Sequence, residues 1–241
     1  MHKNSYVFIF AASVTITCSL LLASAANLLK SRQQENIQLD MRKNILASAG
    51  FMTYGQELTR QEILKLYDEN IKSKVLDLQG EEVPNRQADQ VNPKKEPDLL
   101  PLYYSQQDGQ ITSYIMPISG KGLWSTIYGY LALEPDAITV MGITFYKHGE
   151  TPGLGGEIEK DWFKNNFIGK KILDPEGNLV SVSVIKGKVA EMIPEKEAYH
   201  YVDGISGSTL TGKGLTQFLK ADLEQYEPFF KKVRTKAEME Q

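Results

Sequence analysis

The hydrophobic pattern of the chain begins with a long apolar run near the N-terminus. Tyr6 to Leu29 contains no charged side chain and is dense in leucine, isoleucine, valine and phenylalanine. About 20 such residues span the hydrocarbon core of a bilayer, so the run predicts one transmembrane helix between Lys3 and Lys30. Ala23-Ser24-Ala25 also fits a signal-peptidase site, but the run exceeds the apolar segment of a typical signal peptide. The pattern therefore favours an uncleaved anchor.

Two polar segments after the anchor carry apolar residues at every third or fourth position. Ser31 to Ala49 has this spacing, which predicts that the anchor helix continues as a stalk. Thr59 to Leu78 repeats it and starts with a capping box formed by Thr59 and Glu62, which predicts a covering helix. Glu81 to Pro101 holds four prolines and mostly polar residues, which indicates a linker.

The middle of the chain changes to segments rich in β-branched and aromatic residues. Ile111 to Ile118, Thr126 to Leu133 and Ala137 to Tyr146 are separated by short turns. Sequential strands of this kind predict an antiparallel meander. Val180 to Lys186 has the pattern of another strand, which we expect to continue through Val189 to Ile193.

Helical patterns return towards the C-terminus, over Glu157 to Asn165 and Leu215 to Phe230. Helices first, strands in the middle and a helix last, without βαβ alternation, predict an α+β fold with a largely antiparallel sheet flanked by helices. The predicted divisions are a membrane anchor over 1–30 with its transmembrane part at about 6–29, a helical stalk and covering helix over 31–80, a proline-rich linker over 81–101, a folded domain over 102–232 and a polar tail over 233–241.

Composition narrows the classes of function. The chain has 241 residues, of which 41% are hydrophobic and 24% charged, and its formal net charge is -3. Lysine and arginine are scattered, so we predict no nucleic-acid partner. The only cysteine, Cys18, lies inside the apolar run, and the three histidines are far apart. We therefore predict no disulfide within the chain and no metal site.

Three glycine-bearing segments are the candidates for chemistry. Lys121 to Ser125 fits a hairpin turn, whereas His148 to Gly156 is longer and richer in glycine than a turn requires. Val202 to Gly214 places four glycines and four hydroxyl side chains ahead of the predicted C-terminal helix. Glycine lets a backbone approach a ligand closely, and the N-terminus of a helix attracts phosphate. The third segment therefore predicts a phosphate site.

Two other interpretations of the third segment are weaker. Helix capping by Ser206, Ser208 or Thr209 explains one hydroxyl but not the rest. Gly207 to Lys213 matches the P-loop pattern G-x-x-x-x-G-K, but Gly214 occupies the position where a P-loop needs Ser or Thr. A strand–loop–helix unit of a parallel sheet is also missing, which disfavours nucleotide hydrolysis.

The three segments resemble the C subunit of the sodium-translocating NADH:quinone oxidoreductase. Lys121-Gly122-Leu123-Trp124, the run Gly149-Glu150-Thr151-Pro152-Gly153-Leu154-Gly155-Gly156 and the run Asp203-Gly204-Ile205-Ser206-Gly207-Ser208-Thr209 follow one apolar helix in this order. In that family the last segment resembles D-x-x-[ST]-G-A-T, whose final threonine is esterified to the phosphate of FMN by a separate flavin transferase. That residue is Thr209 here, and Ser208 stands where alanine is usual.

The resemblance implies a covalent flavoprotein in which the flavin ring carries the reaction, so no catalytic acid, base or metal is expected. The expected cofactor-binding residues are Thr209, Asp203, Ser206, Gly207, Ser208 and Lys213 near the phosphate, and Trp124, Glu150, Thr151, Gly153, Leu154 and Gly155 near the ring. The role of Asp203 stays open between orienting its loop and assisting the transferase.

The resemblance also implies an electron-carrier subunit that passes single electrons inside a membrane complex, which oxidises NADH, reduces ubiquinone and exports sodium. Expected partners are the other subunits, the flavin transferase and the bacterial inner membrane. Lys30, Arg32, Arg42 and Lys43 outnumber the basic groups before the anchor, so the positive-inside rule favours a cytoplasmic domain. The family's flavin domain lies outside the cytoplasm, and we follow the resemblance in expecting a periplasmic domain.

Two alternatives remain. The G subunit of an Rnf-type electron-transport complex shares the threonine motif and the E-T-P-G-L-G run, although Gly122-Leu123-Trp124 and Tyr128-Gly129-Tyr130-Leu131 resemble the quinone reductase protein more closely. The other alternative is a non-redox, membrane-anchored module whose glycine loops bind a different phosphate ligand.

Overall fold

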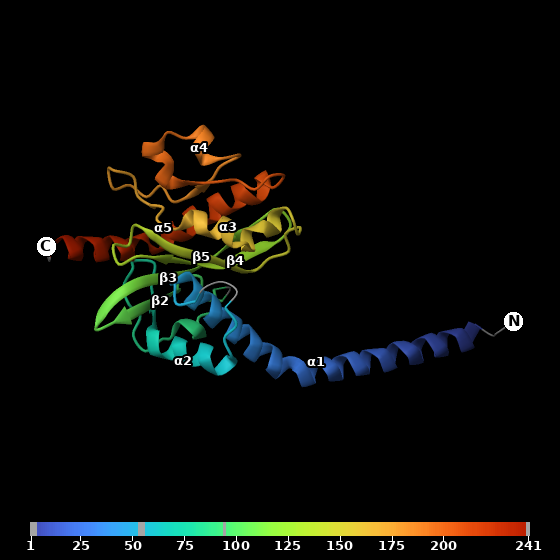
Figure 1. The fold of residues 1–241 in the computed structure, drawn as a ribbon. Helices are drawn as coiled ribbons and strands as arrows, with labels where there is room; N and C mark the ends of the chain where they lie inside the picture. The colour runs from blue at the N-terminus through green and yellow to red at the C-terminus, as the bar shows by residue number, and fades with distance from the viewer. Residues whose placement is uncertain (1–3, 53–55, 94, 240–241) are drawn as a thin grey trace. The chain divides into compact units, whose positions relative to one another are not determined.

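The fold is known from a computed structural model that describes residues 4–52, 56–93 and 95–239. Contacts within the chain divide it into two units, Met1–Asp40 and Met41–Gln241. The first unit is helical, and the second contains a sheet with helices (Figure 1).

The first unit is formed by helix α1, Asn4–Ser48, whose last residues belong to the second unit. The helix is uninterrupted, which confirms the prediction that the helix of the apolar run continues into the segment from Ser31. It is long and apolar enough to cross a membrane, and the apolar side chains of its first part are exposed. Lys3, the expected boundary of the anchor, lies outside the described residues.

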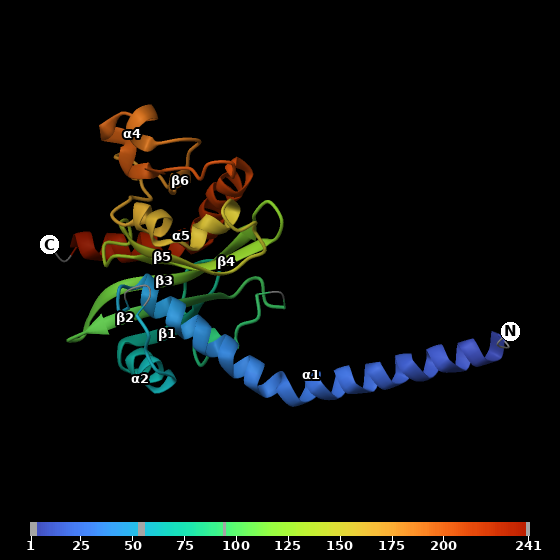
Figure 2. The same ribbon diagram turned by 45° about the vertical axis from the view of Figure 1, so that its right-hand side comes forward.

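The second unit is built on a five-stranded antiparallel sheet in the order β1-β2-β3-β4-β5 (Figures 1 and 2). The strands are β1, Ile71–Leu76; β2, Leu100–Gln107; β3, Gln110–Lys121; β4, Thr126–Leu133; and β5, Val140–Lys147. β3 pairs with β4 from Tyr114 opposite Leu133 to Lys121 opposite Thr126. Because each strand follows its neighbour in the chain, the predicted meander is confirmed.

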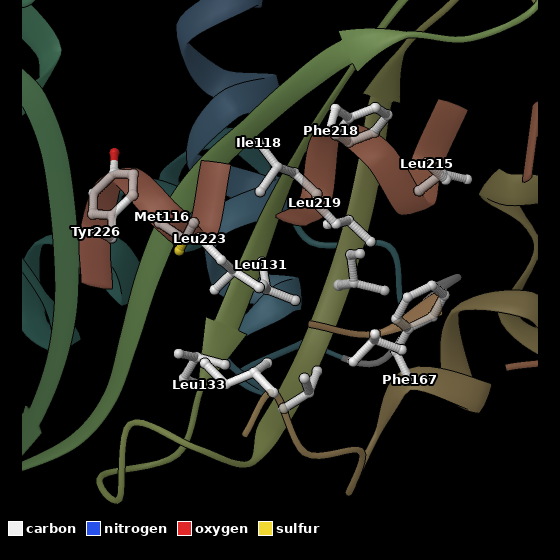
Figure 3. Packing of buried hydrophobic residues seen from close by; sticks show 14 of the residues in the cluster. Met116, Ile118, Leu131, Leu133, Phe167, Leu215, Phe218, Leu219, Leu223 and Tyr226 are labelled. Carbon is white, nitrogen blue, oxygen red and sulfur yellow. The ribbon is translucent and has the colours of Figure 1, made fainter. Parts of the chain in front are cut away.

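Helix α5, Thr209–Met239, covers one face of the sheet. Strand residues alternate between faces, and Met116 and Ile118 of β3 join the cluster of buried side chains that includes those of α5 (Figure 3). α5 contributes Leu215, Phe218, Leu219, Leu223 and Tyr226 to this cluster. Burying one such side chain stabilises the fold by about 1.5–3 kcal/mol, so α5 is held firmly along β3.

The opposite face of the sheet is covered by the end of α1, which contacts β5, and by helix α2, Arg60–Asn70, which contacts β1 and β2. Ile45 and Leu46 at the end of α1 are fully buried. α2 begins with the predicted capping box, since the Glu62 amide donates to the Thr59 side chain and the Thr59 amide donates to Glu62.

The helix predicted over Thr59 to Leu78 is wrong in its second half. α2 ends at Asn70, and the next six residues form edge strand β1, which pairs with β2. Ile71 and Val75 are four residues apart, a spacing that fits both a helix face and alternate positions of a strand. Pairing with β2 decides between them.

The shorter elements differ from their predictions in length and type. No strand was predicted at β2, and Val180 to Lys186 forms only β6, Ser183–Val184, parallel to β7, Tyr201–Val202. Residues predicted to extend that strand form helix α4, Val189–Met192. The remaining short helices are η1, Ala88–Gln90; η2, Gly155–Glu159; α3, Asp161–Lys164; η3, Asn165–Phe167; and η4, Glu195–His200.

Two predicted helices differ from the structure in their continuity or their bounds. The one over Glu157 to Asn165 is broken into η2, α3 and η3. The C-terminal helix starts six residues before Leu215 and continues to Met239 through the expected polar tail. Glycine and threonine at its start weakened the helical pattern in the sequence, because both have low helix propensity.

Candidate functional site

The segment from Asp203 to Thr209 is a turn that leads from β7 into α5. Gly207 has a φ of 74°, in the left-handed region that favours glycine. The Ser208 amide donates to the Ile205 carbonyl at 3.1 Å and closes the turn. Thr209 is then the first residue of a 31-residue helix and is exposed.

The N-terminus of α5 keeps its first amides free. Its first intrahelical bond runs from the Gly212 amide to the Ser208 carbonyl at 3.1 Å. In the described part of the chain, the amides of Thr209, Leu210 and Thr211 donate to no acceptor, and the buried Ser208 Oγ has no partner. Free amides and the helix dipole both favour an anion at this position. The residues present therefore fit a phosphate group beside Thr209.

The loop after β5 lies against this turn. Its residue Leu154 is 43% exposed, and an added Cβ at Gly207 would lie only 2.9 Å from Leu154 Cδ2. The amides of Leu154 and Gly156 both donate to the Thr151 carbonyl, at 3.1 and 3.0 Å. Gly153 has a φ of 74° within this tight loop. The second and third sequence motifs are thus adjacent in space.

Glu150 joins all three motifs. Its Oε1 accepts the amides of Trp124 at 3.0 Å and Ser125 at 3.3 Å. Its Oε2 accepts the Leu123 amide at 3.3 Å and the Thr211 hydroxyl at 2.7 Å. Glu150 is only 5% exposed. Its side chain therefore binds other segments of the chain.

The surroundings of Glu150 favour its charged form. Burial by itself raises the pKa of the Glu150 carboxyl, but the hydrogen bonds from Thr211 and the three amides outweigh it, so the net pKa is lowered. Glycines make room for this carboxylate. An added Cβ at Gly122 would lie 2.6 Å from Oε1, and one at Gly155 would lie 2.7 Å from Oε2.

Exposed apolar side chains gather on the segments around Thr209. Trp124 is 70% exposed, and Leu210, the residue after Thr209, is 57% exposed. With Leu154, they offer apolar surface from all three motifs. Leu210 was missed in the sequence, although its position next to Thr209 in a predicted phosphate turn was a usable signal.

The side chain of Asp203 forms its hydrogen bonds with residues near α4 and not with Thr209. Its Oδ2 accepts Lys188 Nζ at 2.9 Å, and its Oδ1 accepts the Val189 amide at 2.8 Å. Burial raises the pKa of Asp203, but these bonds and Lys170 outweigh it and lower the net pKa. Asp203 also lines a cavity of about 520 Å³ beside α4. These contacts suit a residue that orients its loop.

The remaining predicted residues lie at the surface of the site. Ser206 and Thr151 are exposed in their loops, and Lys213 is exposed on the first turns of α5. Lys213 follows Thr209 by four residues, so both lie on one face of the helix. Thr211 and Gly214 were not predicted. An added Cβ at Gly214 would lie 2.2 Å from the Lys121 carbonyl oxygen, which shows how closely α5 approaches the first motif.

Comparison with known proteins assigns the region of these motifs to a family. The model of the FMN-binding domain family matches residues 122–224, a range that contains all three motifs except Lys121. C subunits of the Na(+)-translocating NADH-quinone reductase are similar along most of the chain. The one from Pseudomonas aeruginosa is 38% identical and covers 90% of each chain, and the one from Yersinia pestis is 36% identical and covers 91% of this chain and 89% of its own.

Solved structures agree with these relatives. The crystal structure of the Na(+)-translocating NADH-quinone reductase C subunit from Parabacteroides distasonis has a TM-score of 0.72 and 36% identity, and the match covers 84% of this chain and 96% of that one. The crystal structure of NqrC from Shewanella oneidensis has a TM-score of 0.66 and 26% identity, and the match covers 81% of this chain and 97% of that one.

Proposed function

Because the chain belongs to the C-subunit family of the Na(+)-translocating NADH-quinone reductase, we propose that it holds FMN through a phosphoester on Thr209 and passes single electrons within that complex. The chain contains an FMN-binding domain. The proposal adds the attachment point and the electron-carrier role. It favours the quinone reductase over an Rnf-type complex, since the curated relatives carry the former name.

The observation that carries the attachment point is the free N-terminus of α5. Thr209 is exposed there, and the amides of Thr209, Leu210 and Thr211 are free within the described residues. Attachment would form a bond between Thr209 Oγ1 and the flavin phosphorus, as the bond from that phosphorus to the leaving group of an activated flavin nucleotide breaks and the hydroxyl loses its proton. The free amides would then bind the phosphate oxygens, and Lys213 adds a positive charge one turn further along.

The apolar side chains would hold the ring. Trp124, Leu154 and Leu210 are exposed on three neighbouring segments, and large apolar and aromatic surfaces bind planar rings well. When bound, FMN supplies the electron transfer. The chain binds and orients it, and the exposed position of Thr209 leaves the site open to a partner protein. The expected partners are the other subunits of the complex and, during maturation, a flavin transferase.

The family also supports a proposal for the location of the site. We propose that α1 anchors the chain in the bacterial inner membrane and that the unit Met41–Gln241 lies in the periplasm. Basic residues are more numerous after the apolar run than before it, which opposes this orientation. The positive-inside rule is a bias with exceptions, so we follow the family over the count of basic residues.

A test compares Thr209→Ala with Thr235→Ala in the full-length chain, coexpressed with a flavin transferase. Thr235 is an exposed threonine of the same helix, so it is a matched control. Intact mass should show one added FMN phosphoester on the wild-type chain and on Thr235→Ala, and none on Thr209→Ala. Flavin fluorescence of the denatured band should agree.

A wild-type chain without added mass would support the non-redox phosphate-binding alternative and reject the proposal. Flavin retained on Thr209→Ala would reject the attachment point alone. Thr211→Ala is unsuitable as a control, because Thr211 is buried and its hydroxyl binds Glu150.

A further inference from the structure

We propose that the hydrogen bond between Glu150 and Thr211 is a positioning device, which fixes the Trp124 turn and the Thr209 hydroxyl relative to each other. The bond joins side chains 61 residues apart in the sequence. Its effect on flavin attachment rests on the proposed function of Thr209. The coupling between the two segments does not.

The first step is the rotation of α5 about its axis. Successive residues of an α-helix are about 100° apart, so Thr209 and Thr211 point to opposite sides of the helix. Thr211 is buried and Thr209 is exposed. Holding the Thr211 hydroxyl at 2.7 Å from Glu150 Oε2 therefore sets the direction in which the first turn presents Thr209.

The hydroxyl of Thr211 has a different kind of hydrogen-bond partner from those of Thr216 and Thr235 in α5. Thr216 and Thr235 each donate to a carbonyl four residues earlier in the same helix, as threonines in helices often do. Thr211 donates instead to a carboxylate on another segment. This bond connects α5 to the rest of the site and adds no hydrogen bond within the helix itself.

The second step is the Trp124 turn. Leu123 and Trp124 are 39% and 70% exposed, so their side chains hold this turn only weakly. Three successive amides, those of Leu123, Trp124 and Ser125, donate to the Glu150 carboxylate. The Gly122 amide donates to the Ser125 carbonyl at 2.8 Å, and the Gly149 amide donates to Ser125 Oγ at 2.6 Å. The turn thus depends on Glu150 and its neighbour Gly149.

The third step is the carboxylate itself. In the described residues Glu150 forms no ion pair, and its charge is stabilised by hydrogen bonds from one hydroxyl and three amides. Removing one of several donors to a buried charge leaves the others to be rearranged. Loss of the Thr211 hydroxyl should therefore loosen the Trp124 turn as well as α5.

The experiment compares Thr211→Val, which keeps the side-chain shape but lacks the donor, with Thr211→Ser, which keeps the donor. Tyr226→Phe is the control for a lost buried hydrogen bond elsewhere, because Tyr226 donates to the Pro101 carbonyl at 2.8 Å. Each change is made in the full-length chain. Amide hydrogen exchange is measured before flavin attachment, and kcat/KM of the flavin transferase is measured with the same proteins as substrates.

We expect exchange at residues 123–125 and at the first bonded amides of α5, from Gly212 onwards, to rise about tenfold in Thr211→Val. About 1.4 kcal/mol of local stability produces a change of this size. We expect kcat/KM for attachment to fall by a similar factor. Thr211→Ser should restore both values, and Tyr226→Phe should lower the melting temperature without changing either.

Wild-type exchange in Thr211→Val would overturn the proposal, and so would faster exchange with an unchanged rate of attachment. Tyr226→Phe matching Thr211→Val in both readouts would also overturn it, since the effect would then follow global stability. If the wild-type chain accepts no flavin while exchange still rises in Thr211→Val, the proposed function fails and the coupling of the two segments stands.

Discussion

At the scale of single residues, glycines determine how closely the segments of the site approach one another. Gly122 and Gly155 leave space for the Glu150 carboxylate, and Gly207 lies under Leu154. A methyl group at any of these positions would meet an atom at 2.9 Å or less. The glycines of the three motifs therefore serve contacts within the protein as well as the approach to a ligand.

A comparison of Gly207→Ala with Gly169→Ala separates the cost of the backbone conformation from the displacement of Leu154. Both glycines have φ near 75°, so both changes should lower the free energy of unfolding by about 1 kcal/mol. Only Gly207→Ala displaces Leu154, since an added Cβ at Gly169 meets nothing within 4 Å. Chemical denaturation should show equal losses, whereas the absorption spectrum of bound flavin should shift in Gly207→Ala alone. A shift in both variants would contradict this assignment of Leu154 to the ring.

At the scale of elements, α5 connects the attachment point to the sheet. Its apolar side chains pack along β3, and an added Cβ at Gly120 of β3 would lie 2.1 Å from Phe218 Cβ. Asp222, one turn after Phe218, accepts the Ser119 amide at 2.7 Å. The end of β3 leads directly into the Trp124 turn, so this contact also supports the site.

Asp222 makes the contact between α5 and β3 depend on pH. Burial raises the pKa of Asp222 from 3.8 to about 7, against the lowering effect of the Ser119 amide. The folded chain therefore holds this proton more tightly than the unfolded chain. The resulting stability is present below pH 4 and is lost between about pH 4 and pH 7, at up to about 1.4 kcal/mol per pH unit.

Asp222→Asn should remove the loss of stability between pH 4 and pH 7, because asparagine does not titrate. It keeps an oxygen that accepts the Ser119 amide. The difference in unfolding free energy between variant and wild type should grow in favour of the variant from pH 4 to pH 7 and then stay constant. Urea denaturation over this range measures it, with the exposed Asp98→Asn as a matched loss of charge. A difference that does not change with pH would show that the surroundings of Asp222 in the folded chain do not raise its pKa.

At the scale of the whole molecule, α1 carries the chain from its apolar N-terminal part into the folded unit that begins at Met41. The helix holds Lys30, Arg32, Arg42 and Lys43. By charge alone these residues favour the cytoplasmic side, whereas the proposed location of the folded unit is the periplasmic side. Orientation is a property of the inserted chain and is open to direct measurement.

A reporter fused after Gln241 tests the orientation. Alkaline phosphatase, which is active only outside the cytoplasm, should be active, and a fluorescent protein that folds in the cytoplasm should stay dark. The two fusions control for each other's expression. The reverse pattern would place the flavin site in the cytoplasm and overturn the proposed location.

Much of the fold could be predicted because it is encoded in local periodicity. The long apolar helix, the capping box at Thr59 and the three central strands all follow from residue spacing and side-chain type. The edge strand β1 could not be predicted, since Ile71 and Val75 fit either element until β2 pairs with them. The two-residue strand β6 was overestimated for the related reason that its pairing partner, β7, is itself only two residues long.

For the site, residue type and spacing were enough to identify the chemical groups: a threonine among glycines ahead of a helix, and two further motifs of recognisable order. The packed fold was needed to show that Glu150 faces Thr211 and the Trp124 turn, and that Asp203 faces Lys188. Local patterns specify turns and helix ends, because their partners are a few residues away. A buried carboxylate finds donors 25 to 61 residues distant only after the sheet and α5 have packed.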